Sequence, residues 1–169
     1  MIDLYTWTTP NGRKVSILLE ELEIEYNVHS INFSQGDQKT PEFLKIGPNN
    51  RIPVIVDSDT GASVMESGAI MIYLAEKYGK FLPQDPLKKT EVMEWLMWQM
   101  GGLGPMLGQA HHFLHFNPGK AEYAEDRFRA EVARLYGVLD ARLAGRDYIC
   151  DTYTIADMAC WPWISRYEW

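Results

Sequence analysis

The sequence predicts an α/β domain followed by an all-helical domain. Strand-like and helix-like segments alternate through residues 1–80, whereas no strand signal occurs beyond residue 88. Between these parts, residues 81–87 contain Leu82-Pro83-Gln84-Asp85-Pro86, a proline-rich polar break. We therefore expect a first domain over residues 1–80, a linker over 81–87 and a helical domain over 88–169.

The first elements of the α/β domain are a strand, a helix and a second strand. Residues 2–7 are rich in β-forming side chains and are followed by turn and capping residues at 8–12, which predicts a strand and then a loop. Apolar residues at helical spacing predict a helix from about Arg13 to about Ile24. The loose alternation of residues 26–33 predicts the second strand.

The domain continues with the short helix 41–44, the strands 52–57 and 62–65, and a longer helix. Pro41 opens the short helix in its first turn, where the missing N–H costs nothing. Ser67 is the expected N-cap of the longer helix, and Gly79 is its expected stop. The resulting order, βαβ, a short α, ββ and α, is thioredoxin-like.

The second half shows only helical patterns. Residues 88–116 and 119–144 predict two long helices, and the glycine-rich segment 101–105 predicts a bend in the first. Thr154 and Asp157 have the spacing of a capping box, which predicts the start of a further helix.

Composition limits the function classes that fit. The chain has 169 residues, 46% of them hydrophobic, which is ample for a buried core. Its 16 basic and 23 acidic residues give a net charge of −7, which argues against a general binder of nucleic acid or anionic membranes. No signal peptide or membrane-spanning segment is evident, so we expect a soluble cytoplasmic protein. The spacing of the two cysteines, Cys150 and Cys160, fits no redox motif, and we expect both to be reduced and buried.

The loop Thr8-Thr9-Pro10-Asn11 lies where a redox thioredoxin would carry its cysteine pair, at a helix N-terminus that favours a thiolate. No sulfur is present in this loop. Two hydroxyls, an amide and backbone N–H groups remain, and such donors suit a thiolate that arrives on a ligand. The alternative interpretation is a plain N-capping turn without chemistry.

Two further segments have features of a peptide-binding site. The Ile52-Pro53 step can hold a cis peptide bond and present the Ile52 backbone to a bound peptide, although cis bonds are uncommon. Ser67 at a helix start can bind a carboxylate, and the adjacent Glu66 can pair with an ammonium group. A plain helix cap is again the alternative interpretation.

Taken together, these motifs resemble those of the cytosolic glutathione transferases. Residues 8–12, 48–53, 66–70 and 101–106 are similar to the bacterial nu class and its fungal Ure2-like relatives. The resemblance spans nearly the whole chain. It implies a thioredoxin-like glutathione-binding domain, a helical domain and a homodimer.

The resemblance also assigns roles to residues. Thr9 and Asn11 would contact the glutathione sulfur, with Thr8 nearby. The backbone of Ile52, next to Pro53, would pair with the cysteinyl part. The remaining glutathione contacts would come from Glu66 and Ser67 at the γ-glutamyl end, from Gln38 and Arg51 at the glycyl side, and from Arg127 in the helical domain.

The chain departs from other branches of the family. Trp7 stands where some members carry a catalytic tyrosine, and no cysteine lies in the loop. The nu class favours reduction of small disulfides, and both sulfurs can come from two bound glutathiones. Family members also continue for several helical segments beyond Trp169. Either the chain is naturally short or its C-terminal part is absent from this sequence, and we expect the latter.

The leading hypothesis is a glutathione-dependent thiol transferase that reduces small disulfides, with weak conjugating or peroxidase activity. Reduced or oxidised glutathione would be the substrate, together with a small disulfide or electrophile, and no metal would be needed. The first alternative is a non-catalytic glutathione-binding regulatory module. The second is a thiol-independent carrier that uses the Met and Trp side chains of residues 93–106. A metal site at His111, His112 and His115 is disfavoured, because no suitably spaced Glu or Cys accompanies them.

Overall fold

The computed structural model describes residues 1–166. The chain divides into two compact units, Met1–Leu82 and Pro83–Trp169. The last three residues of the expected helical domain, 167–169, lie outside the described residues.

The first unit is built on a four-stranded sheet with strand order β2-β1-β3-β4. Its strands are β1 (Ile2–Thr6), β2 (Tyr26–Ser30), β3 (Val54–Asp57) and β4 (Ala62–Met65). β1 and β2 are parallel, whereas β3 is antiparallel to both β1 and β4. The thioredoxin-like expectation is therefore confirmed.

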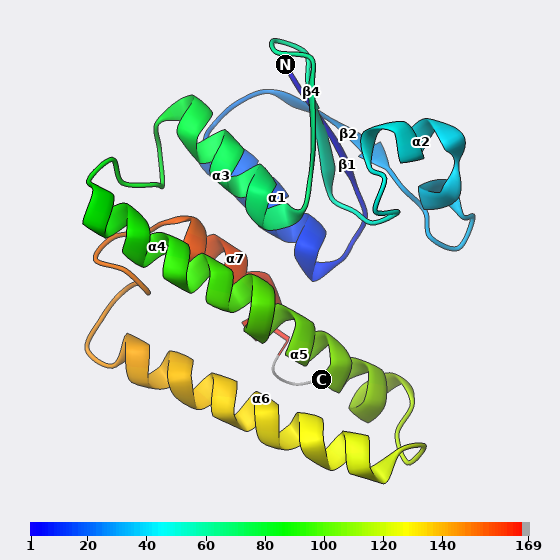
Figure 1. Ribbon diagram of the computed structural model, residues 1–169, viewed down its shortest axis with the longest axis vertical. Coiled ribbons are helices and arrows are strands. Elements are labelled where there is room, and N and C mark those ends of the chain that lie inside the picture. The colour runs from blue at the N-terminus through cyan, green and yellow to red at the C-terminus, as the bar shows by residue number, and fades with distance from the viewer. Residues whose placement is uncertain (167–169) are drawn as a thin grey trace. The chain divides into compact units, whose positions relative to one another are not determined.

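Three α-helices complete this unit: α1 (Pro10–Glu21), α2 (Pro41–Ile46) and α3 (Ser67–Tyr78). α1 and α3 pack beside each other, and Figure 1 shows α2 on the other side of the sheet. A 3₁₀ turn, Asp37–Lys39, precedes α2. The core between the helices and the sheet consists of side chains without solvent exposure, among them Ile2, Leu4, Val15, Leu18, Leu19, Ile55, Ile70 and Leu74.

The start of α1 corrects one sequence-based expectation. The helix begins at Pro10 rather than near Arg13 and ends at Glu21 rather than near Ile24. Pro10 occupies the first turn, where its fixed φ angle is already helical. Thr9 is the N-cap, and its Oγ1 accepts the N–H of Gly12 at 3.1 Å. Residues 10–12, which were expected to belong to the loop, therefore form the first turn of the helix.

The start of α3 corrects a second sequence-based expectation. Glu66 is the N-cap, with φ 70° and ψ 116° and no side-chain capping bond. Ser67 is instead the first helical residue and is buried. β4 ends at Met65, so a single residue must turn the chain from strand to helix, and Glu66 does so in a left-handed conformation. Gly79 ends the helix with φ 66°, as expected.

Other element boundaries differ by a few residues from those expected from the sequence. β2 ends at Ser30 rather than at residue 33, and α2 extends to Ile46 rather than to 44. β3 begins at Val54 rather than at 52, because Pro53 has no N–H for the ladder.

All the secondary-structure elements in the described part of the second unit are helices. Its elements are α4 (Pro86–Trp98), the π-helical turn η2 (Gln99–Leu103), α5 (Gly104–Ala110), the π-helical turn η3 (His111–Phe116), α6 (Glu122–Leu143) and α7 (Ile155–Ile164). The first four run on without a break, and α6 packs against α5 (Figure 1). The expected capping box of Thr154 and Asp157 is confirmed. The helices of residues 1–166 include none with the length and hydrophobicity that a membrane span requires.

The glycine-rich segment that predicted a bend coincides with the π-helical turn. Gly104 lies so close to Gln99 and Trp163 that an added Cβ would approach Gln99 Nε2 to 2.7 Å and Trp163 Nε1 to 3.2 Å. A side chain at this position would therefore require the Gln99 and Trp163 side chains to move.

A buried charge network joins α3 to the sheet. The Asp57 carboxylate has no solvent exposure and accepts hydrogen bonds from Tyr73 Oη and Lys77 Nζ, each at 2.5 Å. Lys77 also contacts Asp59 at 2.7 Å, and Asp59 pairs with the N-terminal amine at 2.9 Å. Burial raises the pKa of Asp57, but the hydrogen bonds from Lys77 and Tyr73 outweigh this effect and hold the pKa below its usual value.

We expect Lys77→Met to lower the free energy of unfolding by about 3 kcal/mol at pH 7, because it leaves the Asp57 charge buried without its cationic partner. The pKa of Asp57 is lower in the folded protein than in the unfolded chain. The pair therefore stabilises the fold above about pH 4, and this contribution is lost as the pH falls through the folded pKa.

Urea unfolding at pH 7 and pH 3 measures this effect. Lys80→Met is the control, since Lys80 is exposed and its side chain has no partner within residues 1–166. A loss at pH 3 as large as that at pH 7 would contradict the assignment.

A second prediction concerns Gly12 in the first turn of α1. An added Cβ at Gly12 would lie 2.5 Å from the Trp7 carbonyl oxygen and would also clash with Thr6 Oγ1. Gly12→Ala should therefore lower the free energy of unfolding by about 1–3 kcal/mol. Gly101→Ala is the matched control, because no atom lies within 4 Å of its added Cβ. Equal thermal stability of the two variants would rule out the close approach.

Candidate functional site

One edge of the sheet brings three of the predicted segments together. In the register of the sheet, Val54 lies opposite Tyr5 of β1 and opposite Met65 of β4. Ile52 and Pro53 precede Val54, the loop Thr8-Thr9 follows β1, and Glu66 follows Met65. Because β3 runs antiparallel to both neighbours, all three segments leave the sheet at the same edge.

The segment before α1 presents hydrogen-bond donors. The Thr9 oxygen accepts the Gly12 N–H, so the hydroxyl proton can be donated elsewhere. Thr8 is exposed, and Asn11 lies half-buried in the first turn. The N-terminus of α1 adds the positive end of the helix dipole. Thr9 is thus an N-cap, and capping leaves its donor available.

The Ile52–Pro53 peptide bond is cis, in agreement with the expectation from the sequence. Ile52 is buried in a cluster with Ile31, Phe43 and Val54, and Trp7 packs against this cluster. Within residues 1–166, neither the amide nor the carbonyl of Ile52 has a backbone partner. An extended peptide could therefore pair with it.

The residues before Ile52 have distinct roles in this geometry. Arg51 is exposed, and its guanidinium donates to the Asn50 carbonyl at 3.1 Å. Asn50 has φ 57°, and its side-chain Oδ1 is buried without a hydrogen-bond partner in the described part of the chain. A non-glycine residue in this conformation often marks a functional site.

The Glu66 carboxylate is exposed at the same edge. It accepts a hydrogen bond from Asn49 Nδ2 at 2.9 Å and has no cationic partner among residues 1–166. Ser67, beside it, is buried in the first turn of α3. The negative charge of Glu66 is therefore available to an ammonium group.

Gln38 lies in the 3₁₀ turn between β2 and α2. Its Oε1 is buried and, in residues 1–166, has no hydrogen-bond partner. Buried oxygen atoms of this kind are rare in native structures, and a ligand N–H would satisfy it.

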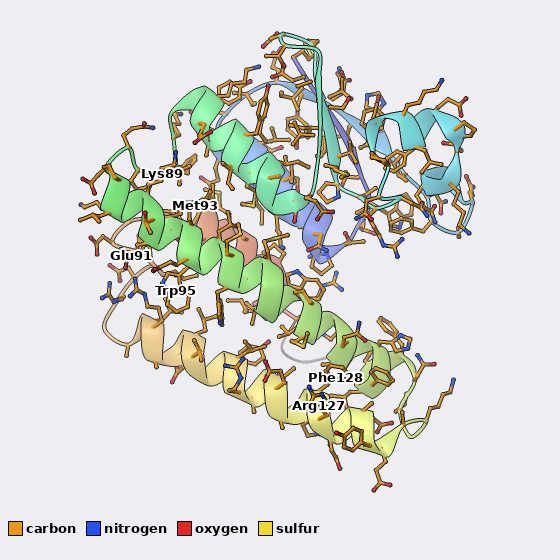
Figure 2. The ribbon with its side chains drawn as sticks, viewed as in Figure 1. Lys89, Glu91, Met93, Trp95, Arg127 and Phe128 are labelled. Atoms are coloured by element: carbon orange, nitrogen blue, oxygen red, sulfur yellow. The ribbon has the colours of Figure 1, made fainter. Side chains whose placement is uncertain are left out.

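Arg127 lies in the second unit, apart from the other predicted site residues along the chain. It lines a cavity of about 610 Å³ together with Met106, Tyr123, Asp126, Phe128, Ala130, Glu131 and Arg134. Figure 2 shows Arg127 and Phe128 on the same part of α6. Arg134 is held by Glu131 through two hydrogen bonds of 2.8 and 2.7 Å, whereas Arg127 has no such partner in the described part of the chain. Its guanidinium is thus available to an anionic ligand.

The cysteines do not supply a reactive thiol. Cys150 and Cys160 are free and buried. Burial, and then the charges of Glu91 and Asp157, raise the pKa of Cys150 to about 11, so its thiol is protonated at neutral pH.

The histidine segment takes part in aromatic packing. His111 stacks on Trp163 with 6.0 Å between ring centroids. Burial, followed by the positive charge of Arg166 and then that of His115, lowers the pKa of His111. Within residues 1–166, no group of three or more His, Cys, Asp or Glu side chains could hold a metal ion.

Trp95, one of the Met and Trp side chains of residues 93–106, also takes part in packing. Arg142 of α6 lies 5.1 Å from the centre of the Trp95 ring, forms an ion pair with Glu91 and donates to the Ile149 carbonyl at 2.6 Å. Figure 2 shows Glu91 and Trp95 close together on α4. Glu91 and Trp95 of α4 therefore help to hold α6 and the loop after it in place.

No role for Asn49 or Asn50 was expected from the sequence, although both belong to the motif of residues 48–53. The available signal was a pair of asparagines, a residue type that tolerates positive φ, immediately before Arg51-Ile52-Pro53.

Comparison with known proteins places this geometry in a family. A family described as glutathione S-transferase, N-terminal domain, matches residues 1–76. The disulfide-bond oxidoreductase YfcG of Escherichia coli is 49% identical over 173 residues, which cover 99% of this chain and 80% of that protein. The disulfide-bond oxidoreductase YghU of the same organism is 47% identical, with 98% of this chain and 60% of that protein covered.

A solved structure supports the same relationship over both units. The chain is 44% identical to a glutathione transferase from Pseudomonas putida, crystallised with one glutathione disulfide bound per protein subunit. The match has a TM-score of 0.92 and covers 99% of this chain and 77% of the other. The sheet edge, the cysteine-free turn before α1 and these similarities together show that the chain belongs to the glutathione transferase family.

Proposed function

We propose that this protein is a glutathione-dependent thiol transferase that reduces small disulfides. The observation that carries the proposal is the turn at the start of α1, where the Thr9 hydroxyl can donate at a helix N-terminus that has no cysteine. A site that stabilises a thiolate without supplying one needs a thiol on its ligand. Two relatives named disulfide-bond oxidoreductases, and a relative that binds glutathione disulfide, support this choice of ligand.

The proposed reaction consists of two thiol–disulfide exchanges. A glutathione thiolate attacks one sulfur of the disulfide, forms a mixed disulfide and releases the other sulfur as a thiolate, which is then protonated. A second glutathione thiolate attacks the glutathione sulfur of the mixed disulfide. Glutathione disulfide and a second thiol are released. Two glutathiones are thereby oxidised and one disulfide is reduced, with no enzyme cysteine required.

The first turn of α1 would lower the pKa of the glutathione thiol. A decrease of about two units from about 8.5 requires roughly 2.7 kcal/mol of preferential thiolate stabilisation. A hydrogen bond from Thr9, donors from Asn11 or Thr8, and the helix dipole are of the right size to supply it.

The rest of glutathione would lie along the sheet edge. The unpaired backbone of Ile52, beside Pro53, suits the cysteinyl residue as an antiparallel partner. Glu66 and Ser67 would bind the ammonium and carboxylate of the γ-glutamyl end. Gln38 and Arg51 would reach the glycyl end. Arg127 would contact an anionic group of a bound glutathione.

Several finer features are also part of the proposal. Weak glutathione conjugation or peroxidase activity would use the same activated thiol. We further propose a homodimer and a cytoplasmic location, both from membership of the family. The exchange chemistry involves no metal ion.

Isothermal titration with reduced and oxidised glutathione, followed by an assay with the mixed disulfide of glutathione and hydroxyethanethiol, tests the function. Binding with turnover would support the reductase. Binding without turnover would favour a regulatory module, which is the main alternative. The absence of binding would overturn the proposal.

Thr9→Ala should lower kcat/KM for disulfide reduction by about 10- to 100-fold, the loss expected for one hydrogen bond to a charged group. The pKa of the bound glutathione thiol should rise, because the thiolate loses a donor. Thiolate absorbance of the complex as a function of pH measures that pKa.

Two control variants separate catalysis from capping. Thr9→Ser keeps the hydroxyl and should retain most of the activity. Thr40→Ala removes the equivalent N-cap of α2, where Thr40 Oγ1 accepts the Phe43 N–H at 3.3 Å, and should leave turnover unchanged. Equal losses in Thr9→Ala and Thr40→Ala would mean that Thr9 contributes only to the fold.

Arg127→Ala should raise the KM for glutathione by about fivefold, which corresponds to about 1 kcal/mol for a partly exposed ion pair. Arg134→Ala is the matched control in the same cavity, since Glu131 already holds that guanidinium. Steady-state kinetics of both variants measure the KM for glutathione. A similar effect of both substitutions would argue for general electrostatic attraction rather than a specific contact.

A further inference from the structure

Asn49 and Glu66 connect two segments of the candidate site that are distant in sequence. Asn49 lies in the loop before the Ile52–Pro53 bond, and Glu66 joins β4 to α3. The bond from Asn49 Nδ2 to Glu66 Oε1 measures 2.9 Å, and no other hydrogen bond to the Glu66 side chain occurs in the described part of the chain.

The backbone on both sides of this hydrogen bond is constrained. Asn50, next to Asn49, has φ 57°, and Glu66 itself has φ 70°. Residues with side chains rarely adopt such angles, and the surrounding structure must hold them there. Opposite these residues, the pairing of Val54 with Met65 fixes the distance between the two segments. Both side chains are therefore presented from backbone with little freedom to move.

The chemistry of the pair suits recognition of an ammonium group. The Asn49 amide is neutral, so Glu66 keeps its full negative charge. The hydrogen bond occupies Oε1 and leaves Oε2 to a ligand. Both side chains are exposed, so a partner from solution can reach the carboxylate. An aspartate or glutamate in place of Asn49 could not donate in its ionised form and would repel Glu66.

We propose that Asn49 is a positioning residue that determines specificity, because it orients the Glu66 carboxylate toward the α-ammonium group of a γ-glutamyl thiol. This inference rests on the proposed function. It goes beyond that function in one respect. Asn49, which does not touch the ligand, would determine whether the site distinguishes thiols that carry the ammonium group from thiols that lack it.

The test compares two ligands. One is glutathione, and the other is glutaryl-cysteinylglycine, the same molecule with hydrogen in place of the α-amino group. Calorimetry gives the dissociation constant of each ligand for the wild-type protein, Asn49→Ala, Glu66→Gln and the double variant. Asn27→Ala is the matched control, because Asn27 Nδ2 donates to a carboxylate oxygen of Asp3 at 3.1 Å on the exposed strand β2.

We expect Asn49→Ala to weaken glutathione binding by about five- to tenfold and to change binding of the deaminated ligand by less than about twofold. In the Glu66→Gln background, the same substitution should have no further effect on glutathione, because the two residues act as a unit. Asn27→Ala should bind both ligands as the wild type does.

Equal weakening of both ligands by Asn49→Ala would overturn the inference, since it would mean that Asn49 only supports the loop. Unchanged binding of both ligands would overturn it as well. If the wild-type protein binds neither ligand, the proposed function fails and the role of Asn49 fails with it. If the wild-type protein binds glutathione but Asn49→Ala discriminates between the two ligands as the wild type does, only the role of Asn49 fails. The proposed function then stands.

Discussion

The candidate site depends on the antiparallel pairing of β3 with both β1 and β4. This pairing aligns Val54 with Tyr5 on one side and with Met65 on the other. Three segments that are separated in the sequence therefore emerge at one edge of the sheet. A shift of one residue in either register would move the backbone of Ile52 away from its neighbours and turn the β3 side chains to the opposite face.

The sheet edge also requires close approaches that only particular residues permit. Gly12 lies against the Trp7 carbonyl, and an added Cβ at Gly47 would lie 2.7 Å from Val54 Cγ2. Asn50 and Glu66 adopt left-handed conformations that need support from the surrounding fold. The buried cluster of Ile31, Phe43, Ile52 and Val54 supplies part of that support, because it anchors Ile52 beneath the loop. The interactions that stabilise the first unit therefore also shape its site.

The distribution of sulfur and charge determines which chemistry fits the molecule. Burial raises the pKa of Cys150 to about 11, and the turn before α1 carries donors in place of a thiol. Reactive sulfur must therefore come from the ligand. Lys77 and Arg134 are engaged by carboxylates of the protein, whereas Glu66 and Arg127 form no ion pair with the described residues. Glu66 and Arg127 can therefore contribute charge to ligand binding.

The sequence by itself determined the fold class, the order of the elements and the segments proposed for the candidate site. Periodic apolar residues, Pro41, Gly79 and the Thr154 capping box are local signals, and local signals predict helices and strands well. The tertiary structure alone decided how these elements begin and what their side chains do. Ser67 is not the N-cap of α3, because the direct passage from β4 to the helix assigns that position to Glu66. The contact of Asn49 with Glu66 joins residues 17 positions apart through the β3–β4 register, and no local pattern predicts such a contact. Local propensity acts over a few neighbouring residues, whereas a binding site is assembled from long-range pairing and packing.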